Sequence, residues 1–286
     1  MRNVGGRLER PGGDVKIGVL TYYFDPIPTN CVADWVCPAT TGRGYPKYAR
    51  SPLGEDGYYN LAVFYGACSL DCLYCQNWQY REYSSSPRLV SVEELEKTMG
   101  RRVTCVCFFG GDPAPQTVHA LLVAKKAAER GVRVCWETSG QLAPHLLDKV
   151  VEVSLETGGI VKFDLKAFTP SVYKALTDGE VDIVLRNFKA AARRFRERPE
   201  VPLVVASILL VPGYVDDEVE VDLLTKFVAR IDPEIPTRFL AFHPDYMLRD
   251  LPPTSRRHAE TAVKIARENG LVEVSLGNQW LLGDYY

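Results

Sequence analysis

The sequence predicts an α/β fold, a partial (β/α)6 barrel of the TIM type preceded by an irregular N-terminal extension. Two observations support this prediction. From about residue 60 onward, short apolar runs alternate about six times with longer segments of helical character. Polar or glycine-rich segments follow the apolar runs, where the C-terminal ends of barrel strands usually carry a site. We therefore expect an N-terminal extension over residues 1–59 and a barrel domain over residues 60–286.

The N-terminal extension contains one β-prone run, residues 15–24, which we expect to form a strand. Residues 25–60 are rich in Pro, Gly and Tyr, and we expect them to pack on the barrel or to serve a function. Residues 1–14 lack the apolar segment of a signal peptide. The longest apolar run, residues 201–212, contains two prolines and is too short to span a bilayer. We therefore expect a cytoplasmic protein without a membrane partner.

The barrel elements follow one another in order. The expected strands cover residues 60–67, 103–109, 132–137, 160–165, 203–210, 237–242 and 272–276. The expected helices cover residues 91–99, 115–130, 142–156, 181–197, 216–231 and 254–269. Ser91 followed by two glutamates is typical of a helix start, and acidic residues also open the helix at Asp216. Gly131 and Gly270 follow two of the helices, as is typical of helix ends.

The charge balance excludes one class of function. The chain has 34 Lys and Arg against 36 Asp and Glu, a formal net charge of -2. A nucleic-acid-binding protein usually has a basic excess or a basic stripe. Short basic pairs such as Arg193-Arg194 are typical of solvated helix ends. We therefore expect no nucleic-acid partner.

Three of the eight cysteines, Cys68, Cys72 and Cys75, form a C-x3-C-x2-C motif directly after the first expected barrel strand. Thiolates at this spacing favour an iron–sulfur or zinc centre. A structural zinc site or a ferredoxin cluster needs a fourth ligand, and the nearest other cysteine, Cys105, follows an expected helix. Three local thiols therefore indicate a metal centre with one open position. A zinc loop completed from elsewhere and a chance spacing are the alternatives.

Around these cysteines the sequence resembles the radical S-adenosylmethionine (SAM) superfamily, from about residue 60 to 278. The three cysteines with Tyr74 before the last resemble its motif. Within the superfamily the chain resembles the activating-enzyme type, which includes pyruvate formate-lyase activating enzyme and the homologues associated with the AmmeMemoRadiSam system. The matching segments are Cys75-Gln-Asn77, Phe163-Asp-Leu-Lys166, Leu210-Val-Pro-Gly213, Asp216-Asp217, Phe242-His-Pro-Asp-Tyr246, Asp250-Leu-Pro-Pro-Thr254 and Gly277-Asn278.

The resemblance implies a [4Fe-4S] cluster held by Cys68, Cys72 and Cys75, with SAM on the remaining iron. In this superfamily an electron from the reduced cluster cleaves SAM, and the 5′-deoxyadenosyl radical removes a hydrogen atom from the substrate. The chain would then be a radical SAM oxidoreductase that needs an electron donor of the ferredoxin or flavodoxin type. Its substrate would be the backbone glycine of a partner protein, another site in a protein, or a small molecule.

Several SAM-binding roles follow from the resemblance. Tyr74 matches an aromatic residue near the adenine. Gly110, Gly111 and Asp112 resemble the Gly-Gly-Glu segment that binds the SAM amino group, with a carboxylate one methylene shorter here. Lys166 matches the lysine that binds the SAM carboxylate by a charge-assisted hydrogen bond.

Four further residues at strand ends belong to the expected site. Glu137 and Asp164 match acidic residues that help to bind a monovalent cation beside SAM in activating enzymes, although the first is usually Asp there. Ser139 lies in the turn that would face SAM. His243 matches a histidine near the SAM ribose.

The other five cysteines have no role in this resemblance. Cys105, Cys107 and Cys135 lie in expected strands, where a free cysteine is usually a small buried hydrophobe. Cys31 and Cys37 could form a disulfide, ligate a second metal with help from elsewhere, or do neither. Two hypotheses from other classes also remain, a zinc-stabilised scaffold and an electron carrier whose cluster takes Cys31 or Cys37 as its fourth ligand.

Overall fold

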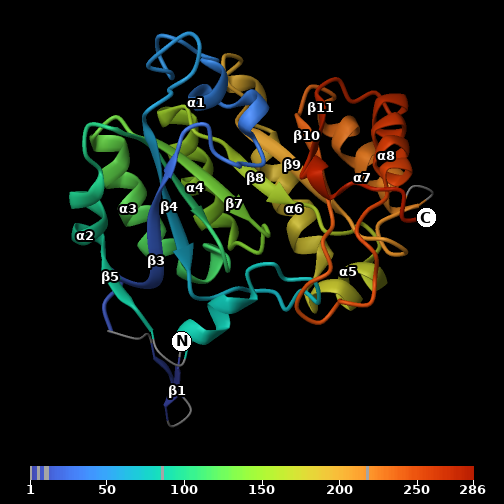
Figure 1. The fold of residues 1–286 in the computed structure, drawn as a ribbon. Coiled ribbons are helices and arrows are strands. Elements are labelled where there is room, and N and C mark those ends of the chain that lie inside the picture. The colour runs from blue at the N-terminus through green and yellow to red at the C-terminus, as the bar shows by residue number, and fades with distance from the viewer. Residues whose placement is uncertain (1, 5–6, 10–12, 85–86, 217–218) are drawn as a thin grey trace.

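A computed structural model gives the fold. A nine-stranded sheet runs through the molecule in the order β11-β10-β9-β8-β7-β6-β4-β3-β5 (Figure 1). The structure describes residues 2–4, 7–9, 13–84, 87–216 and 219–286. Asp217, one half of the Asp216-Asp217 segment, lies outside the described residues.

The sheet is a partial barrel, as the sequence predicts. From β11 to β4 all neighbouring strands are parallel, whereas β3 pairs antiparallel with β4 and with β5. Among the described residues, the sheet ends at β5 and β11, which do not pair with each other. In sheet order the strands are β11 (Val274–Gly277), β10 (Thr237–Ala241), β9 (Val204–Leu210), β8 (Val161–Asp164), β7 (Arg133–Thr138), β6 (Val103–Phe109), β4 (Tyr59–Tyr65), β3 (Ile17–Pro26) and β5 (Leu89–Ser91).

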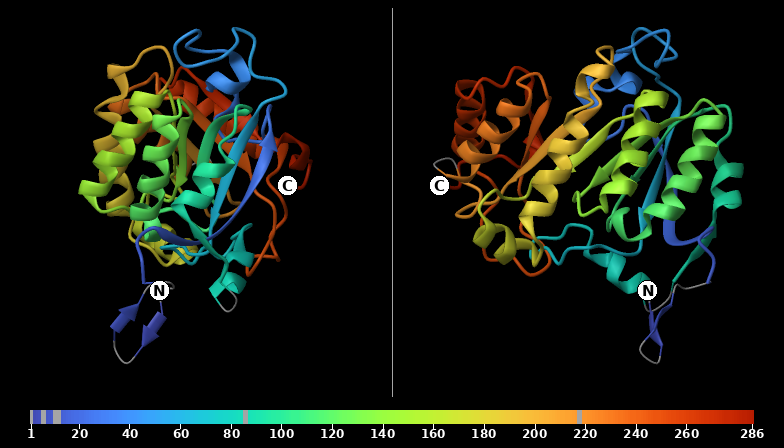
Figure 2. Two further views of the ribbon diagram at one scale, coloured as in Figure 1. Left: turned by 90° about the vertical axis from the view of Figure 1, so that its left-hand side faces the viewer. Right: turned by 180° about the vertical axis from the view of Figure 1, so that it is seen from behind.

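Helices cover the outer face of this sheet (Figure 2). They are α2 (Val92–Thr98), α3 (Thr117–Glu129), α4 (Pro144–Thr157), α5 (Pro170–Thr177), α6 (Val181–Ala192), α7 (Glu220–Ile231) and α8 (Arg256–Glu268). Side chains alternate along each strand, so Val106 and Phe108 of β6 join the main hydrophobic core. Cys105 and Cys107, on the other face of β6, point into the barrel interior and line a cavity there.

One helix is shorter than the sequence predicts. The expected helix 181–197 ends as α6 at Ala192, and a 3-10 turn follows. Arg198 is buried beyond that turn, and its guanidinium donates hydrogen bonds to the carbonyls of Ser154 at 2.7 Å and Gly159 at 2.6 Å. The chain must turn inward after α6 to make these hydrogen bonds. They join distant segments, so the local sequence pattern does not predict them.

The α5 helix was not expected at all, because eight residues are too few to show a clear periodicity. Helix α7, which comes after β9, begins at Glu220 rather than Asp216. The Glu220 carboxylate accepts hydrogen bonds from the backbone N–H groups of Phe168 at 2.5 Å and Thr169 at 3.1 Å. This tertiary contact holds Glu220, the first residue of α7, in place.

The N-terminal extension packs on the barrel. Residues 20–26 of its strand β3 pair with the whole of β4, residues 17–19 pair with β5, and a hairpin of β1 (Arg2–Val4) and β2 (Arg7–Glu9) precedes β3. The segment with the 3-10 turn η1 (Asp34–Val36) and the helix α1 (Pro38–Thr41) lies over the N-terminal ends of the barrel strands (Figure 1). Val36 packs there against Ile160, Val201 and Val205. The extension therefore covers the N-terminal ends of the barrel strands and leaves their C-terminal ends open for the site.

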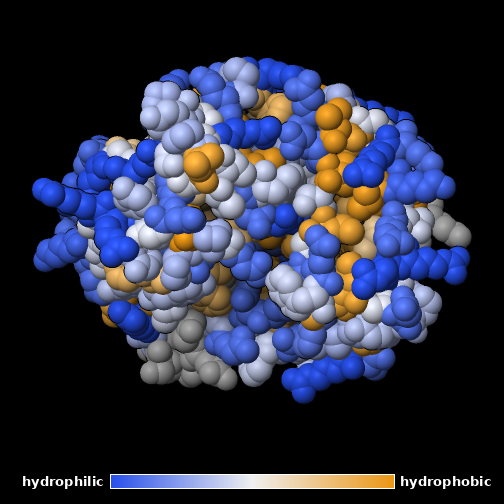
Figure 3. Space-filling model, turned by 45° about the horizontal axis from the view of Figure 1, so that its top comes forward, coloured by the Kyte–Doolittle hydropathy of each residue, from blue (hydrophilic) through white to orange (hydrophobic). Residues whose placement is uncertain are grey.

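The face of the molecule in Figure 3 is mostly hydrophilic, with an apolar band on the side of β10, β11 and α8. Val272 and Trp280 are exposed large hydrophobic residues of the C-terminal region. Among the described residues, no helix has the length and apolar character that crossing a membrane requires.

Candidate functional site

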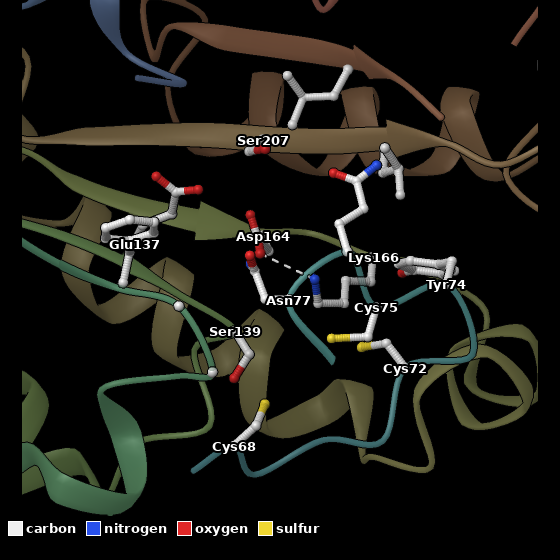
Figure 4. A pocket seen from close by; sticks show the side chains of 16 residues that line it. Cys68, Cys72, Tyr74, Cys75, Asn77, Glu137, Ser139, Asp164, Lys166 and Ser207 are labelled. Carbon is white, nitrogen blue, oxygen red and sulfur yellow. Dashed lines mark hydrogen bonds and ion pairs between the residues drawn. The ribbon is translucent and has the colours of Figure 1, made fainter. Parts of the chain in front are cut away.

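A pocket of about 160 Å³ at the C-terminal ends of the strands gathers the cysteine motif and most of the expected site (Figure 4). Every residue that the sequence assigned to the site lines this pocket, except Asp112 and His243. The lining includes Cys68, Cys72, Tyr74, Cys75, Gly110, Gly111, Glu137, Ser139, Asp164 and Lys166. Residues from five different strand ends and from one loop therefore meet in a single cavity.

The cysteines sit on the loop that follows β4, and backbone hydrogen bonds fix this loop. The N–H groups of Asp71 and Leu73 donate to the carbonyls of Thr177 and Leu176, at 2.8 and 2.9 Å, at the end of α5. The N–H of Cys75 donates to the Cys72 carbonyl at 3.1 Å, which closes a tight turn between two of the thiols. Helix α5 thus holds the loop against the barrel mouth.

Of the three thiols, that of Cys72 is buried, and those of Cys68 and Cys75 are half-buried. Burial raises the pKa of Cys72 to about 11, although the Lys166 ammonium lowers it in part. Burial also raises the pKa values of Cys68 and Cys75, and Lys166 again opposes the shift. The free thiols are therefore protonated near neutral pH, and a metal would have to displace these protons.

The donor set fits an iron–sulfur cluster with one iron free for another ligand. Within the described chain, no fourth cysteine lines this pocket. The remaining wall offers polar groups to a ligand, among them Asn77 and Lys166. Tyr74 is 4% exposed, and its buried Oη has no hydrogen-bond partner among the described residues. A buried hydroxyl without a partner is costly, which fits a wall built to contact a bound molecule.

Lys166 and Asp164 form the main charged pair of the pocket. The Lys166 Nζ lies 3.0 Å from Asp164 Oδ2 and 5.9 Å from the centre of the Tyr74 ring (Figure 4). Burial lowers the pKa of Lys166, but Asp164, together with Cys72 and Tyr74, more than offsets burial and the net shift is upward. Lys166 is therefore an ammonium ion at neutral pH and can donate to an anionic group in the pocket.

Two glycines allow β6 to approach the cysteine loop. Gly110 and Gly111 have φ angles of 64° and 49°, in the left-handed region. A Cβ on Gly111 would lie 2.3 Å from the carbonyl oxygens of Tyr65 and Ala67. The next N–H, that of Asp112, donates to the Ala67 carbonyl at 2.7 Å. The glycine turn and the start of the cysteine loop are thus in direct backbone contact.

Asp112 lies behind the pocket wall, not on it. Its side chain is 2% exposed and accepts hydrogen bonds from Thr138 Oγ1 at 2.9 Å and from the N–H of Ala114 at 3.0 Å. It also accepts from the Ser139 hydroxyl. Aspartate is one methylene shorter than glutamate, and here it turns back onto the end of β7. The structure therefore places Asp112 as a support of the Ser139 turn.

His243 is also outside the pocket. It follows β10 and is exposed to solvent. Glu137 does line the pocket, yet its Oε2 lies 3.6 Å from the Nζ of Lys162, deeper in the barrel. Glu137 and Asp164 thus each have a lysine partner in this structure.

Sequence reasoning missed three polar residues of the pocket, Gln76, Asn77 and Ser207. Gln76 and Asn77 directly follow the motif. Ser207 is the one hydroxyl in the apolar run of β9, on the face that points into the barrel. A single polar residue at mid-strand was the signal that could have identified it.

Comparison with known proteins relates this chain to the radical SAM superfamily. The family model of the radical SAM superfamily matches residues 62–224. An uncharacterized protein of Methanocaldococcus jannaschii is 28% identical over 225 residues, which cover 77% of this chain and 63% of that protein. The chain thus spans less than two thirds of that relative's length. The pyruvate formate-lyase-activating enzyme of Staphylococcus aureus is 26% identical over 193 residues, which cover 63% of this chain and 73% of the enzyme.

A solved structure shares the fold. Streptococcus suis SuiB bound to S-adenosylmethionine superposes with a TM-score of 0.53 and 12% identity, over 75% of this chain and 49% of SuiB. At this identity the likeness concerns the fold alone.

Proposed function

The chain belongs to the radical SAM superfamily, and from this premise we propose that Cys68, Cys72 and Cys75 hold a [4Fe-4S] cluster on which SAM is reductively cleaved. When bound, the cluster and SAM supply the one-electron chemistry that yields a 5′-deoxyadenosyl radical, which removes a hydrogen atom from the substrate. The observation that carries the proposal is the pocket itself. Three thiols from one loop share it with the Lys166 ammonium and with four other strand ends.

The chain's own residues would bind and orient the cofactor. The three thiolates would ligate three irons, and the loop bonds to α5 would hold their spacing. Lys166 would donate charge-assisted hydrogen bonds to the SAM carboxylate, with Asp164 fixing the position of its Nζ. The Tyr74 Oη, which lacks a partner among the described residues, would bond to the bound SAM. The Gly110-Gly111 turn would bring backbone groups close to it.

The substrate is proposed from the relatives. The Staphylococcus aureus relative is named as the activator of another enzyme, pyruvate formate-lyase, which supports a partner protein as the substrate. We propose that the hydrogen atom is removed from a backbone glycine of that partner. Another site in a protein, or a small molecule, is the alternative substrate within the same chemistry. We further propose a ferredoxin or flavodoxin as electron donor and a cytoplasmic location.

The test is anaerobic reconstitution of the full chain with iron and sulfide, reduction with dithionite, and addition of SAM. We expect 5′-deoxyadenosine to form and the electron paramagnetic resonance signal of the reduced cluster to change when SAM is added. The Cys72→Ala variant, treated in the same way, is the control for adventitious iron. A bound zinc ion, or a cluster that does not respond to SAM, would overturn the proposal in favour of a scaffold or an electron carrier.

A further inference from the structure

All eight cysteines of the chain line one of two neighbouring pockets. Three line the site pocket described above, and five line an inner cavity of about 280 Å³ deeper in the barrel. These five are Cys31, Cys37, Cys105, Cys107 and Cys135. The two pockets share Phe109 and Glu137 as a common wall. Cysteines that served only as small core residues would also be expected between the sheet and its helices. These cysteines instead line cavities inside the barrel.

Three of the inner thiols come from adjacent strands. On β6, Cys105 and Cys107 point into the barrel because they alternate with Val106 and Phe108 of the outer core. Cys135 on β7 lies directly opposite Cys107 in the parallel register. The strand pairing alone therefore places Cys107 and Cys135 side by side on the inner face.

The other two thiols come from the N-terminal extension. Cys31 and Cys37 flank the short turn η1 and reach the same cavity from the N-terminal side of the barrel. Cys31 lies beside Lys162 of β8, with its Sγ 3.2 Å from the lysine Nζ. The extension thus closes the cavity and adds two sulfurs to those of the strands.

Lys162 makes the charge balance of this cavity unusual. It is 1% exposed, and its Nζ donates to Cys31 Sγ at 3.2 Å and to Cys107 Sγ at 3.1 Å. Its carboxylate partner, Glu137, is 3.6 Å away. Burying an ammonium ion is costly unless negative charge accompanies it. Glu137 supplies one negative charge, but the two sulfurs are closer to the Lys162 ammonium. Neutral thiols carry no such charge, whereas metal-bound thiolates are negative and accept N–H···S hydrogen bonds.

We propose that the inner cavity is a second metal site, which binds a thiophilic centre through Cys31, Cys37, Cys107 and Cys135, with Lys162 compensating the thiolate charge. Four thiolates are the ligand set of a structural zinc ion or of an iron–sulfur cluster. Cys105 is left out because its thiol donates to Asn60 Oδ1 at 3.3 Å. This proposal does not depend on the SAM chemistry proposed above.

The thiols must turn to close such a site. Among the described residues, no three Cys, His, Asp or Glu side chains are already placed around a single ion. This holds equally for Cys68, Cys72 and Cys75, whose superfamily implies a bound cluster. A cysteine has one side-chain torsion to its sulfur, and its staggered rotamers give it several sulfur positions. Metal binding would also displace the thiol protons that burial retains on Cys31 and Cys37.

The test uses the full chain with Cys68, Cys72 and Cys75 all changed to Ala, so that the first site cannot contribute. The variant is loaded anaerobically, in one arm with zinc and in the other with iron and sulfide, and is desalted before its metal content is measured. We expect one tightly held centre per chain in one of the arms. Substitution of Co²⁺ for zinc should give sulfur-to-metal charge-transfer absorption, and a cluster should give its own visible spectrum.

A second set of variants assigns the ligands. Adding Cys31→Ser and Cys107→Ser should abolish the retained metal, whereas adding Cys105→Ser should leave it unchanged. Circular dichroism reports whether each variant is folded. A triple variant that is folded yet free of metal in both arms would overturn the proposal. So would a Cys31–Cys107 disulfide in protein purified without oxygen, or metal that survives the loss of Cys31 and Cys107. Because the first site is absent throughout, these results do not depend on whether the chain cleaves SAM.

Discussion

Asp112 Oδ1 accepts a hydrogen bond from Thr138 Oγ1 at 2.9 Å, which ties the end of β6 to the end of β7. The same oxygen accepts from the N–H of Ala114 at 3.0 Å, and Oδ2 accepts from the N–H of Ser139 at 3.3 Å. One buried carboxylate thus fixes two neighbouring strand ends of the pocket. The resembling Gly-Gly-Glu segment has a glutamate where this chain has Asp112. Its side chain is one methylene longer, so its carboxylate would not fit these hydrogen bonds.

Replacing Asp112 by Ala should therefore act mainly on stability. Thr138, Ser139 and Ala114 would lose their acceptor in the interior, at a cost of about 1–3 kcal/mol of unfolding free energy. Urea unfolding of the purified chain measures this cost. Asp112→Asn keeps one acceptor oxygen and should recover part of it. Unchanged stability together with a large loss of SAM affinity would instead show that Asp112 contacts SAM directly.

Replacing Gly111 by Ala should disrupt the cysteine loop. The new Cβ would lie 2.3 Å from two backbone oxygens, and backbone atoms cannot give way without moving the loop. Gly213→Ala is the matched control, because Gly213 also has a positive φ, 75°, but has no atom within 4 Å of the added Cβ. We expect the control to lose only about 1 kcal/mol of stability. Iron content after reconstitution should fall in Gly111→Ala and remain normal in Gly213→Ala, and equal iron content in both variants would contradict the steric argument.

Replacing Lys166 by Ala should weaken SAM binding by about 1.5–3 kcal/mol, the range for a hydrogen bond to a charged group. This corresponds to roughly 10- to 150-fold in dissociation constant. Isothermal titration of the reconstituted protein measures it, with iron content as a check that the cluster is intact. Lys174→Ala is the control, since Lys174 is not in the pocket lining and forms exposed ion pairs with Asp178 and Glu180. An unchanged affinity for SAM would remove Lys166 from the site.

Changing any one of Cys68, Cys72 and Cys75 to Ala should abolish SAM cleavage, because two thiolates do not retain a stable cluster at this motif. Deoxyadenosine production and the visible spectrum after reconstitution provide the measurement. Cys105→Ala is the control, since Cys105 lines the inner cavity and is not among the ligands proposed for either site. Normal cluster content in all three motif variants would refute the ligand assignment.

A buried ion pair anchors the extension on the barrel. Glu55 Oε1 lies 2.7 Å from Arg133 Nη1 at the first residue of β7, and both side chains are buried. Glu55→Gln should cost about 3–5 kcal/mol of unfolding free energy, because it leaves a buried guanidinium without its counter-charge. The exposed pair of Arg194 and Glu197 offers a matched control, where Glu197→Gln should cost no more than about 1 kcal/mol. Chemical unfolding at pH 7 distinguishes the two, and a cost of Glu55→Gln as small as that of the control would contradict this role.

The same ion pair predicts a pH dependence. Burial raises the pKa of Glu55, but the hydrogen bonds and charge of Arg133, together with hydrogen bonds from Thr104 and the Arg50 N–H, lower it by more, so the folded-state pKa lies below the ordinary 4.5. A depressed carboxyl pKa contributes stability that is fully present above the unfolded pKa and is lost as the pH falls through the folded pKa. The stability difference between wild type and Glu55→Gln should therefore shrink as the pH falls below 4.5. A difference that stays constant down to pH 3 would show that the charge of Glu55 is not responsible.

Several features could be predicted from local sequence. Strand β6 was predicted to the residue, because an apolar β-branched and aromatic run between a helix end and a glycine turn has few alternatives. The cysteine motif and the strand ends were also predictable, since their residue types and spacing are local and parallel strands must end on the same edge. Helix α5 was not predictable, because it has too few residues for a periodic pattern.

The sequence by itself determined the alternation of strands and helices, the three-cysteine motif and the side of the barrel that carries it. Only the tertiary structure decided which carboxylates enter the pocket, since Asp112 turns away toward Thr138 whereas Asp164 turns toward Lys166. It also decided where the other five cysteines lie. Cys31 and Lys162 are 131 positions apart along the chain and meet only because the extension folds over the N-terminal ends of the strands. Periodicity assigns a side chain to one face of its own element, but contacts between distant segments depend on packing that no local pattern encodes.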